Sequence, residues 1–348
     1  MPVLPLETDR LRLRIMRPEE APILARYRND PEVARYQDWH LPFTVADAER
    51  LLAGQAGVTD LLADDWVQIA IERRDEDPVV VGDVLVGDVA VGLRGDGIAL
   101  IGYTLAPEHQ GRGYASEAAA AIVDAIFEHT SVHRIVATLD PQNHASMRVI
   151  EPLGFRYEGT ARAAEPIRGE WLDDARFAVL RADRDAWLAR PRDRPAHVEL
   201  VEITPDLLRR VLALETHRFQ RQFVAPMELS LAQALVPPTY VGEPMVPWFR
   251  AVVADGVVVG FVMLGEPMAS QPAPYLWRLL IDRHHQGRGI GAAVIGILAE
   301  RLRAEGHTAM DVSWVDAPGG PRRFYERLGF VPTGVIDDDG EVEARLVL

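Results

Sequence analysis

The sequence of 348 residues contains no cysteine and no lysine. The absence of cysteine excludes disulfides, thiolate metal sites and cysteine nucleophiles. The absence of lysine excludes Schiff-base catalysis through that side chain and a Walker-type phosphate loop, which requires a lysine. Every basic side chain is therefore arginine or histidine.

The 37 basic residues are outnumbered by 52 acidic ones, so the formal net charge is −15. A general nucleic-acid binder needs basic side chains for the phosphate backbone, so that class is disfavoured. A negative surface attracts cationic substrates, although solubility alone is the other explanation. The N-terminus lacks a signal-peptide pattern, and no apolar run reaches the roughly 18 residues that span a bilayer. We therefore expect a cytoplasmic protein without nucleic-acid or membrane partners.

The sequence repeats itself over a domain-sized distance. HQGRGYA at residues 109–115 returns as HQGRGIG at residues 285–291, and each is followed by a Leu-Gly-Phe. The offset is 286 − 110 = 176 residues at the glutamines and 329 − 154 = 175 at the Leu-Gly-Phe glycines. A shift that holds over such a length indicates an internal duplication. We predict domains at residues 1–190 and 197–348, with residues 191–196 as an exposed linker.

Each half shows the same order of predicted elements. A strand and one or more helices lead into several strands, the glycine turn, a helix, a strand, a helix and a hairpin. In the second half, Thr204 is the expected N-cap of a helix with Pro205 at its first position. Asp255 and Gly256 supply the turn of a hairpin. Such strand–turn–helix units predict a mixed α/β fold.

The glycine turns predict an anion site. A strand that enters a helix through glycines exposes unpaired N–H groups at the helix start, where the helix dipole also favours negative charge. Glycine lets a phosphate approach the backbone closely, and Arg112 and Arg288 add positive charge. A tight turn without a ligand is the alternative for a single motif. The dinucleotide fingerprint Gly-x-Gly-x-x-Gly, with an acid about 20 residues later, fits neither copy.

The two turns resemble the pyrophosphate-binding signature of the GNAT acyl-CoA N-acyltransferase superfamily. The matching patterns are Gln-x-x-Gly-x-Ala at residues 110–115 and Gln-x-x-Gly-x-Gly at residues 286–291, each with its Leu-Gly-Phe downstream. The first half also resembles the ribosomal-protein N-terminal acetyltransferase branch through Asn143 and Ser146. The second half resembles the diamine and polyamine branch, but Pro318 stands where that branch has asparagine.

The resemblance implies two domains, each a mostly antiparallel mixed sheet flanked by helices, with acetyl-CoA as the donor and no metal. The strand before each turn is expected to diverge from its neighbour at a bulge, which frees an N–H for the thioester carbonyl. The coenzyme-binding residues implied are Leu105, Gln110, Gly111, Arg112, Gly113, Tyr114, Ala115, Asn143 and Ser146 in the first half, and Ile281, Gln286, Gly287, Arg288, Gly289, Ile290, Gly291 and Tyr325 in the second.

Direct transfer to an amine needs a proton donor and a proton acceptor. In the second half, Tyr325 matches the tyrosine that protonates the coenzyme sulfur in this superfamily; packing beside Phe324 is its alternative role. In the first half, Ile150 occupies the matching position and cannot donate. Ser146 or water is left for that task, or the first half binds the coenzyme without efficient turnover.

The proton acceptor is less defined. Asp88, Glu215 and Glu266 are candidates, and a solvated surface position is the alternative for each. His284 and His285 are adjacent, so on an extended segment they point to opposite faces and do not both chelate a metal. His109 is expected to be a turn residue.

The expected acceptor is a small primary amine of polyamine type. Alternatives are a protein N-terminus or an antibiotic amine. A further alternative has one catalytic half and one coenzyme-binding structural or regulatory half, and another has coenzyme sensing without turnover. Trp39 lies in the variable region that forms acceptor pockets and is expected in the core. A monomer and a homodimer are both open.

Overall fold

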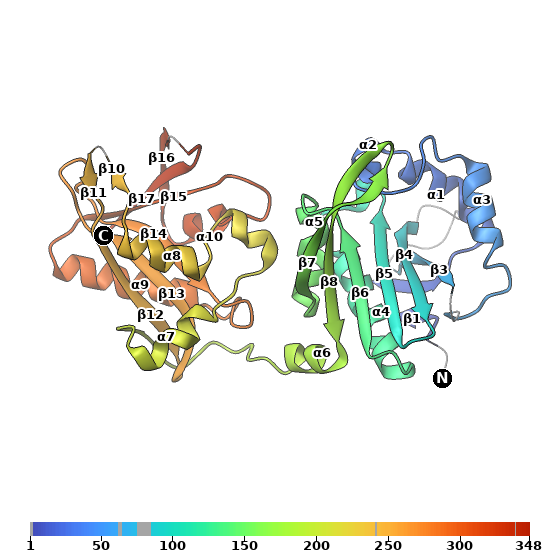
Figure 1. Ribbon diagram of the computed structural model, residues 1–348, viewed down its shortest axis with the longest axis horizontal. Coiled ribbons are helices and arrows are strands. Elements are labelled where there is room, and N and C mark those ends of the chain that lie inside the picture. Colours follow the sequence, from blue (N-terminus) through green and yellow to red (C-terminus); the bar gives the residue numbers. More distant parts are fainter. Residues whose placement is uncertain (1–2, 62–64, 75–84, 241, 338) are drawn as a thin grey trace. The chain divides into compact units, whose positions relative to one another are not determined.

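The computed structural model describes residues 3–61, 65–74, 85–240, 242–337 and 339–348. The chain divides into two compact units, Met1–Ala189 and Arg190–Leu348 (Figure 1). None of the helices in the described residues is long and apolar enough to cross a membrane.

The first unit is built on an eight-stranded sheet with the order β1-β2-β3-β4-β5-β6-β8-β7. Its strands are β1 (Leu6–Glu7), β2 (Leu11–Ile15), β3 (Trp66–Arg73), β4 (Leu85–Arg94), β5 (Ile98–Leu105), β6 (Arg134–Leu139), β7 (Arg156–Ile167) and β8 (Glu170–Leu180). The β5–β6 pair is parallel and every other pair is antiparallel. The predicted final hairpin is present as β7 and β8.

Helices and short 3-10 turns pack against this sheet. They are η1 (Pro18–Glu20), α1 (Ala21–Arg28), α2 (Pro31–Ala34), α3 (Val45–Ala53), η2 (Pro107–His109), α4 (Tyr114–His129), α5 (His144–Ile150), η3 (Glu151–Leu153) and α6 (Arg181–Leu188). The alanine-rich helix α4 buries Ala118, Ala119, Ile122 and Ile126. These positions recur at helical spacing, so one apolar face of α4 covers the sheet.

The second unit repeats the plan with a seven-stranded sheet ordered β16-β17-β15-β14-β13-β12-β9. Its strands are β9 (Val198–Val201), β12 (Pro247–Ala254), β13 (Val257–Gly265), β14 (Tyr275–Ile281), β15 (Ala309–Trp314), β16 (Val331–Ile336) and β17 (Val342–Val347), with β10 (Thr239–Tyr240) and β11 (Glu243–Pro244) as a separate pair. Its helices are α7 (Pro205–Leu212), η4 (Arg218–Gln222), α8 (Met227–Leu235), α9 (Ile290–Ala304) and α10 (Arg322–Arg327). The β14–β15 pair is parallel.

Two local predictions for the second unit are confirmed. Thr204 is the N-cap of α7 and Pro205 is its first residue. Asp255 and Gly256 form the turn between β12 and β13 with φ of 48° and 80°. Both angles lie in the left-handed region that a two-residue hairpin turn of this type requires.

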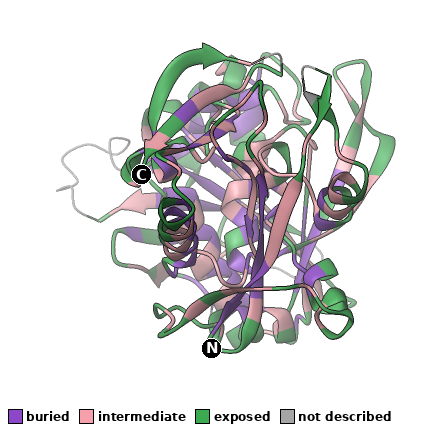
Figure 2. Cartoon of the chain, turned by 90° about the vertical axis from the view of Figure 1, so that its left-hand side faces the viewer, coloured by how far each residue is buried: buried purple, intermediate pink, exposed green. Residues whose placement is uncertain are grey.

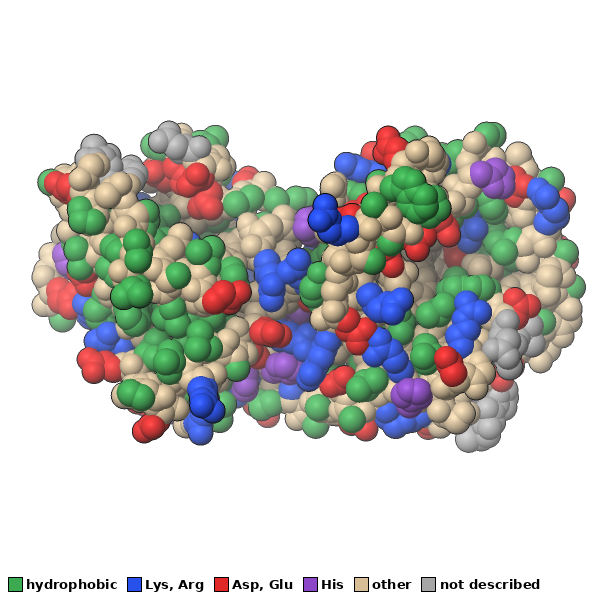
Figure 3. Space-filling view, viewed as in Figure 1, with side chains coloured by type: hydrophobic (Ala, Val, Ile, Leu, Met, Phe, Trp, Pro, Cys, Tyr) green, Lys and Arg blue, Asp and Glu red, His purple; other side chains and the backbone are tan. Residues whose placement is uncertain are grey.

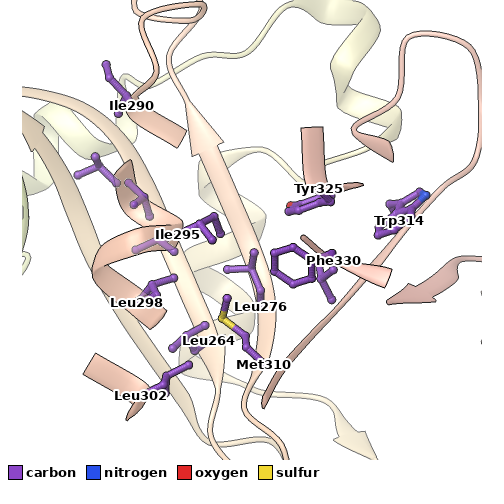
Figure 4. Close-up of a cluster of buried hydrophobic side chains, with 14 of the residues drawn as sticks. Leu264, Leu276, Ile290, Ile295, Leu298, Leu302, Met310, Trp314, Tyr325 and Phe330 are labelled. Atoms are coloured by element: carbon purple, nitrogen blue, oxygen red, sulfur yellow. The ribbon is translucent and has the colours of Figure 1, made fainter. Parts of the chain in front are cut away.

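Helices cover both faces of the second sheet, and each face has its own apolar cluster. The first cluster joins Leu264 and Leu276 of the sheet to Leu298 and Leu302 of α9, with Tyr325 at its edge (Figure 4). The second cluster joins α7, α8 and the opposite side of β13 and β14. Buried residues are accordingly concentrated in the central strands (Figure 2).

Candidate active site

In both units the one parallel strand pair opens into a fork that faces the glycine turn. The β5–β6 pairing ends at Leu100, and β5 continues to Leu105. The β14–β15 pairing ends at Leu276, and β14 continues to Ile281. The predicted divergence of the strand before each turn is therefore observed.

The predicted position of the bulge is wrong. The β4–β5 ladder runs to Leu105 without a register shift. The β13–β14 ladder does shift, but at Trp277, which lies unmatched between Leu276 and Arg278, and Ile281 is again in register. The separation of two parallel strands, rather than a bulge at the last residue, therefore opens the sheet beside each turn.

A glycine on the neighbouring strand accommodates the last residue of each forked strand. Gly87 pairs with Leu105, and Gly260 pairs with Ile281. A Cβ added to Gly87 would lie 2.7 Å from Leu105 Cδ2, and one added to Gly260 would lie 2.8 Å from Ile281 Cδ1. Sequence analysis missed this pair, although Val-x-Val-Gly precedes both positions at residues 84–87 and 257–260.

The two turns share one backbone geometry. The φ angles are 73° and 81° at Gly111 and Gly113, and 77° and 76° at Gly287 and Gly289. Gly113 and Gly289 are the N-caps of α4 and α9, and neither cap is satisfied by a side chain. Because the first N–H to bond within α4 is that of residue 117, the preceding N–H groups of the helix have no intrahelical acceptor. The arrangement fits an anion at each helix start.

A glutamine maintains the shape of each turn. Gln110 Nε2 donates to the Leu105 carbonyl at 3.1 Å, and Gln286 Nε2 donates to the Ile281 carbonyl at 2.9 Å. Each side chain thus ties the turn back to the end of its strand. Both glutamines therefore position the turn relative to the strand that precedes it.

The two turn arginines differ. Arg112 is exposed, and its carbonyl accepts from Arg10, which also forms an ion pair with Glu117 at 2.6 Å. Arg288 is buried, and its Nε donates to the Asp193 carbonyl at 2.8 Å. Arg288 therefore anchors the segment that precedes β9.

The remaining turn residues contribute mainly their backbone. Tyr114, Ala115 and Ile290 bury their side chains in the core. Gly291 lies against Phe324, because an added Cβ would be 3.1 Å from the ring. Packing thus favours a glycine at residue 291 independently of any ligand.

A cavity of about 610 Å³ in the second unit joins the turn to the fork. Its wall includes Gly287, Gly289, Ser313 and Tyr325, and also Arg278 of β14. Its size is typical of small-molecule sites. The turn and the proposed proton donor therefore belong to one continuous space.

Tyr325 stands at the edge of the α9 cluster. Its ring stacks on Trp314 at 5.5 Å and meets Phe330 edge-on at 5.4 Å (Figure 4). Burial raises the pKa of the Tyr325 phenol, with a smaller contribution from Tyr275. The phenol therefore remains protonated at neutral pH, as a proton donor requires.

Two family models match the chain. One, described as an acetyltransferase (GNAT) domain, matches residues 10–156, and one described as the acetyltransferase (GNAT) family matches residues 212–330. An uncharacterized N-acetyltransferase of Bacillus licheniformis is 32% identical over 183 residues, which are 51% of this chain and 97% of the relative. The chain belongs to the GNAT family of acetyltransferases. The prediction of two such domains in tandem, each a mixed sheet flanked by helices, is confirmed.

Two further proteins that resemble the GNAT chain are an enzyme with a named acceptor and a solved structure. A [ribosomal protein uS5]-alanine N-acetyltransferase of Escherichia coli (strain K12) is 32% identical over 83 residues, or 24% of this chain and 43% of that enzyme. A solved GNAT acetyltransferase from Bacillus anthracis is 28% identical, with coverage of 51% of this chain and 98% of its own and a TM-score of 0.44.

In the first GNAT unit, Asn143 and Ser146 lie at the start of α5. Asn143 Oδ1 accepts from the Ser146 N–H at 3.0 Å, so the asparagine caps the helix. The Tyr103 hydroxyl of β5 lies 2.7 Å from Ser146 Oγ and also donates to the Ser146 carbonyl. Sequence analysis did not select Tyr103. Its position two residues before Leu105, on the forked part of β5, was the available signal.

Asp88 is the one predicted base that is buried. It lies in β4 and accepts from the Tyr27 hydroxyl at 2.5 Å, with Arg28 at 3.8 Å. Burial raises the pKa of Asp88, although Arg28 and Tyr27 oppose the rise. The carboxylate is held in a dry polar cluster beneath α1.

The other two predicted bases lie outside the cavity wall. Glu215 is exposed, and its backbone bonds with residues 282 and 283. Glu266 forms an ion pair with Arg301 at 3.5 Å. Neither side chain is among the residues that line the cavity.

The histidines near the turns have separate tasks. His284 Nδ1 contacts Asp282 at 3.0 Å, whereas His285 Nδ1 faces Arg288 at 2.9 Å. His109 ends η2 at the first turn. No group of three metal-ligating side chains occurs among the described residues.

Trp39 is half-buried against the α1–α3 core, and its Nε1 donates to the Arg28 carbonyl.

A polar cluster that sequence analysis missed lies on the face of the second sheet opposite α9. The Tyr275 hydroxyl is 2.6 Å from Ser313 Oγ, and the Ser313 hydroxyl donates to Glu341. Burial raises the pKa of Tyr275 to about 12, with Glu341 adding to the rise. These residues are distant in sequence, so no local pattern marks them.

Proposed function

We propose that the second unit transfers the acetyl group of acetyl-CoA directly to the primary amine of a small molecule, with Tyr325 as the proton donor. The observation that carries the proposal is the single cavity that runs from the glycine turn to the Tyr325 phenol at the fork. The curated relatives that are named N-acetyltransferases agree with this reaction class.

The residues present fit the coenzyme. The N–H groups at the start of α9 and the left-handed Gly287 and Gly289 suit a diphosphate. No aspartate or glutamate is among the described residues that line the cavity, so no fixed negative charge opposes it. When bound, acetyl-CoA supplies an acetyl thioester. The residues that would hold it are those of the turn, together with the wall of the fork.

Acetyl transfer forms a C–N bond and breaks a C–S bond, so the chain must take one proton from the amine and give one to sulfur. Tyr325 is suited to give a proton because its phenol is neutral. Glu341, acting through Ser313 and Tyr275, is suited to accept one. The proposed acid, Tyr325, and the polar cluster of the proposed base, Glu341, lie on opposite faces of the sheet. This arrangement suits a coenzyme and an amine that enter from different sides.

For the first unit, we propose coenzyme binding at the α4 turn, with Tyr103 and Ser146 in place of the phenol that α5 lacks. Ile150, at the matching position, is completely buried and has no proton to give. The Tyr103 hydroxyl reaches the fork from β5 instead. Acetylation by both units and a division into one catalytic and one coenzyme-binding unit are the two outcomes to distinguish.

The acceptor expected from the sequence was a polyamine. The cavity of the second unit carries Arg278 and Arg327 on its wall, and these positive charges favour an acceptor that carries a negative charge. On the visible face of the first unit, acidic and basic side chains are interspersed, and neither sign dominates there (Figure 3).

The test combines coenzyme binding with turnover. Calorimetry of the full chain with CoA is expected to give two sites, one for each turn. Thiol release from acetyl-CoA with a panel of amines then measures transfer, and a thiol reagent is suitable because the chain has no cysteine. No heat from CoA at either site would overturn the proposal. Binding without thiol release from any amine would reduce it to coenzyme sensing.

A further inference from the structure

The bulge in β14 determines which way Arg278 faces. Met263 of β13 pairs with Arg278 and Leu264 pairs with Leu276, so Trp277 is the extra residue. Strict alternation from Leu276, which packs toward α9, would send Arg278 toward α9 as well. A bulge re-aims the side chains that follow it.

The observed contacts show the result. Trp277 packs with the α7–α8 cluster, and Arg278 Nη2 donates to Gln233 of α8 at 2.9 Å. Leu279, the next residue, packs with the α9 cluster again. Two successive side chains, Trp277 and Arg278, therefore share the face opposite the helix whose N-terminus suits the diphosphate.

Arg278 has no anionic partner among the described residues. Its Nη1 donates to the Trp277 carbonyl at 2.7 Å, and the guanidinium lies 5.5 Å from the Trp277 ring. A guanidinium has five N–H donors. The bonds to the Trp277 carbonyl and to Gln233 therefore leave donors unused. Among the described residues, no carboxylate lies within ion-pair distance of Arg278, and its Nε has no acceptor. Glu341 acts on Arg278 only at longer range.

The charges on the cavity wall have one sign. Besides Arg278, the wall includes Arg327, and its described residues include no aspartate or glutamate. Burial lowers the pKa of Arg278, which reports the cost of holding this cation partly away from water. An anion from outside the chain would remove that cost.

We propose that Arg278 binds a carboxylate of the acceptor, so that the second unit acetylates a small amine that carries a carboxylate, as a free amino acid does. The inference rests on the proposed acetyl transfer and adds the substrate class. Guanidinium and carboxylate match in shape and charge, and such charge-assisted bonds are among the strongest. With the carboxylate at Arg278, a positive amine end can meet the Tyr275–Ser313–Glu341 cluster on the same face.

The coenzyme is a less suitable partner for Arg278. Along β14, Arg278 lies three positions before Ile281, a distance of about 10 Å in a strand. Leu279 and Ile281 face α9 and its N-terminus, whereas Arg278 faces α8. The phosphates and the carboxylate therefore occupy different sides of the sheet.

The test uses substrate pairs that differ only in the carboxylate. Thiol release from acetyl-CoA is measured for the full chain with free amino acids and with the corresponding amino amides, and with spermidine as a polycation. The wild-type chain is expected to favour at least one amino acid over its amide by about tenfold or more in kcat/KM, the range for a charge-assisted bond. The variant Arg278→Gln is expected to bring that ratio close to one, mainly through KM.

A matched control is Arg250→Gln. Arg250 of β12 also donates to the carbonyl of the preceding residue, Phe249, and its guanidinium lies 4.7 Å from a tryptophan ring, but it is not on the cavity wall. This control is expected to keep the acid-to-amide ratio. Arg278→Lys is expected to restore part of the preference that Arg278→Gln loses.

Binding separates failure of this inference from failure of acetyl transfer. Calorimetry with CoA present measures amino-acid affinity for the wild type and for Arg278→Gln. The ligand is the preferred amino acid, or each amino acid in turn if none gives thiol release. Tighter binding of an amino acid than of its amide, lost in the variant, supports the inference even without turnover. Equal binding, a preference for amides or spermidine, or an equal loss of CoA affinity in Arg278→Gln overturns it.

Discussion

The Tyr275 hydroxyl lies 2.6 Å from Ser313 Oγ, and Ser313 in turn donates to Glu341. Tyr275 starts β14 and Ser313 lies near the end of β15, so the contact bridges the two strands at the vertex of the fork. Glu341 comes from the turn before β17. The chain thus brings a carboxylate to the point where the amine is expected.

If Glu341 accepts the amine proton through this chain of hydroxyls, Glu341→Gln should lower kcat by about a hundredfold to ten-thousandfold, the range for a general base. Ser313→Ala should lower it less, because water can replace a hydroxyl. Glu341→Gln should also leave CoA affinity by calorimetry unchanged, which a structural disruption of the site would not. Glu343→Gln, also near the start of β17, is the control. An unchanged kcat in Glu341→Gln would exclude this carboxylate as the base.

Tyr325→Phe should lower kcat by about a hundredfold, because general acids contribute on that order. The phenylalanine ring preserves the stacking on Trp314, so CoA affinity by calorimetry should change little. Tyr157→Phe, which removes a hydroxyl bonded to Thr160 in the first unit, serves as the control. A Tyr325→Phe enzyme with full kcat would leave Tyr325 as a packing residue only.

Gly113→Ala and Gly289→Ala should each abolish one CoA site. Their φ angles of 81° and 76° cost an alanine about 1 kcal/mol or more, and relaxation turns the N–H groups away from the anion. Calorimetric stoichiometry should fall from two sites to one in each variant. Loss of thiol release in only one of them would identify the catalytic unit.

Gly57→Ala and Gly306→Ala are matched controls for these turns. Both glycines have a left-handed φ, of 80° and 89°, and both have open space where a Cβ would stand. They should lose similar stability while they retain both CoA sites. Equal loss of CoA binding in the controls would mean that strain, rather than the turn, explains the result.

His217 should make the second unit sensitive to acid. Burial, with Arg283 as the next cause, lowers the pKa of His217 to about 4 from 6.5. Between these two values the unfolded chain takes up a proton that the folded unit does not, so stability falls as pH falls. The loss amounts to about 3 kcal/mol by pH 4.

The measurement is the free energy of urea unfolding of the full chain between pH 7 and pH 4, with hydrogen exchange in β13 and β14 to follow the second unit. His217→Gln should flatten the pH dependence, whereas His197→Gln, at an exposed position, should not. A wild-type slope that persists in His217→Gln would assign the effect to other groups.

Much of the fold could be predicted because its signals are local. The glycine turns, the hairpin at Asp255–Gly256 and the cap at Thr204 each depend on a few neighbouring residues with restricted φ and ψ. Repetition of the turn and of Leu-Gly-Phe at nearly one offset then established two similar domains. The roles of Gln110 and Arg288 could not be read in this way, since each depends on a backbone carbonyl that folding brings near.

The sequence by itself determined the duplication and the two glycine turns, because backbone conformation at glycine is a local property. It also indicated the reaction class, through the resemblance of these turns to a known family. Only the tertiary structure decided where the sheet opens, that Glu341 meets Ser313, and that Arg278 turns to the face opposite α9. Those features depend on strand register, where one extra residue at Trp277 changes the face to which an arginine points.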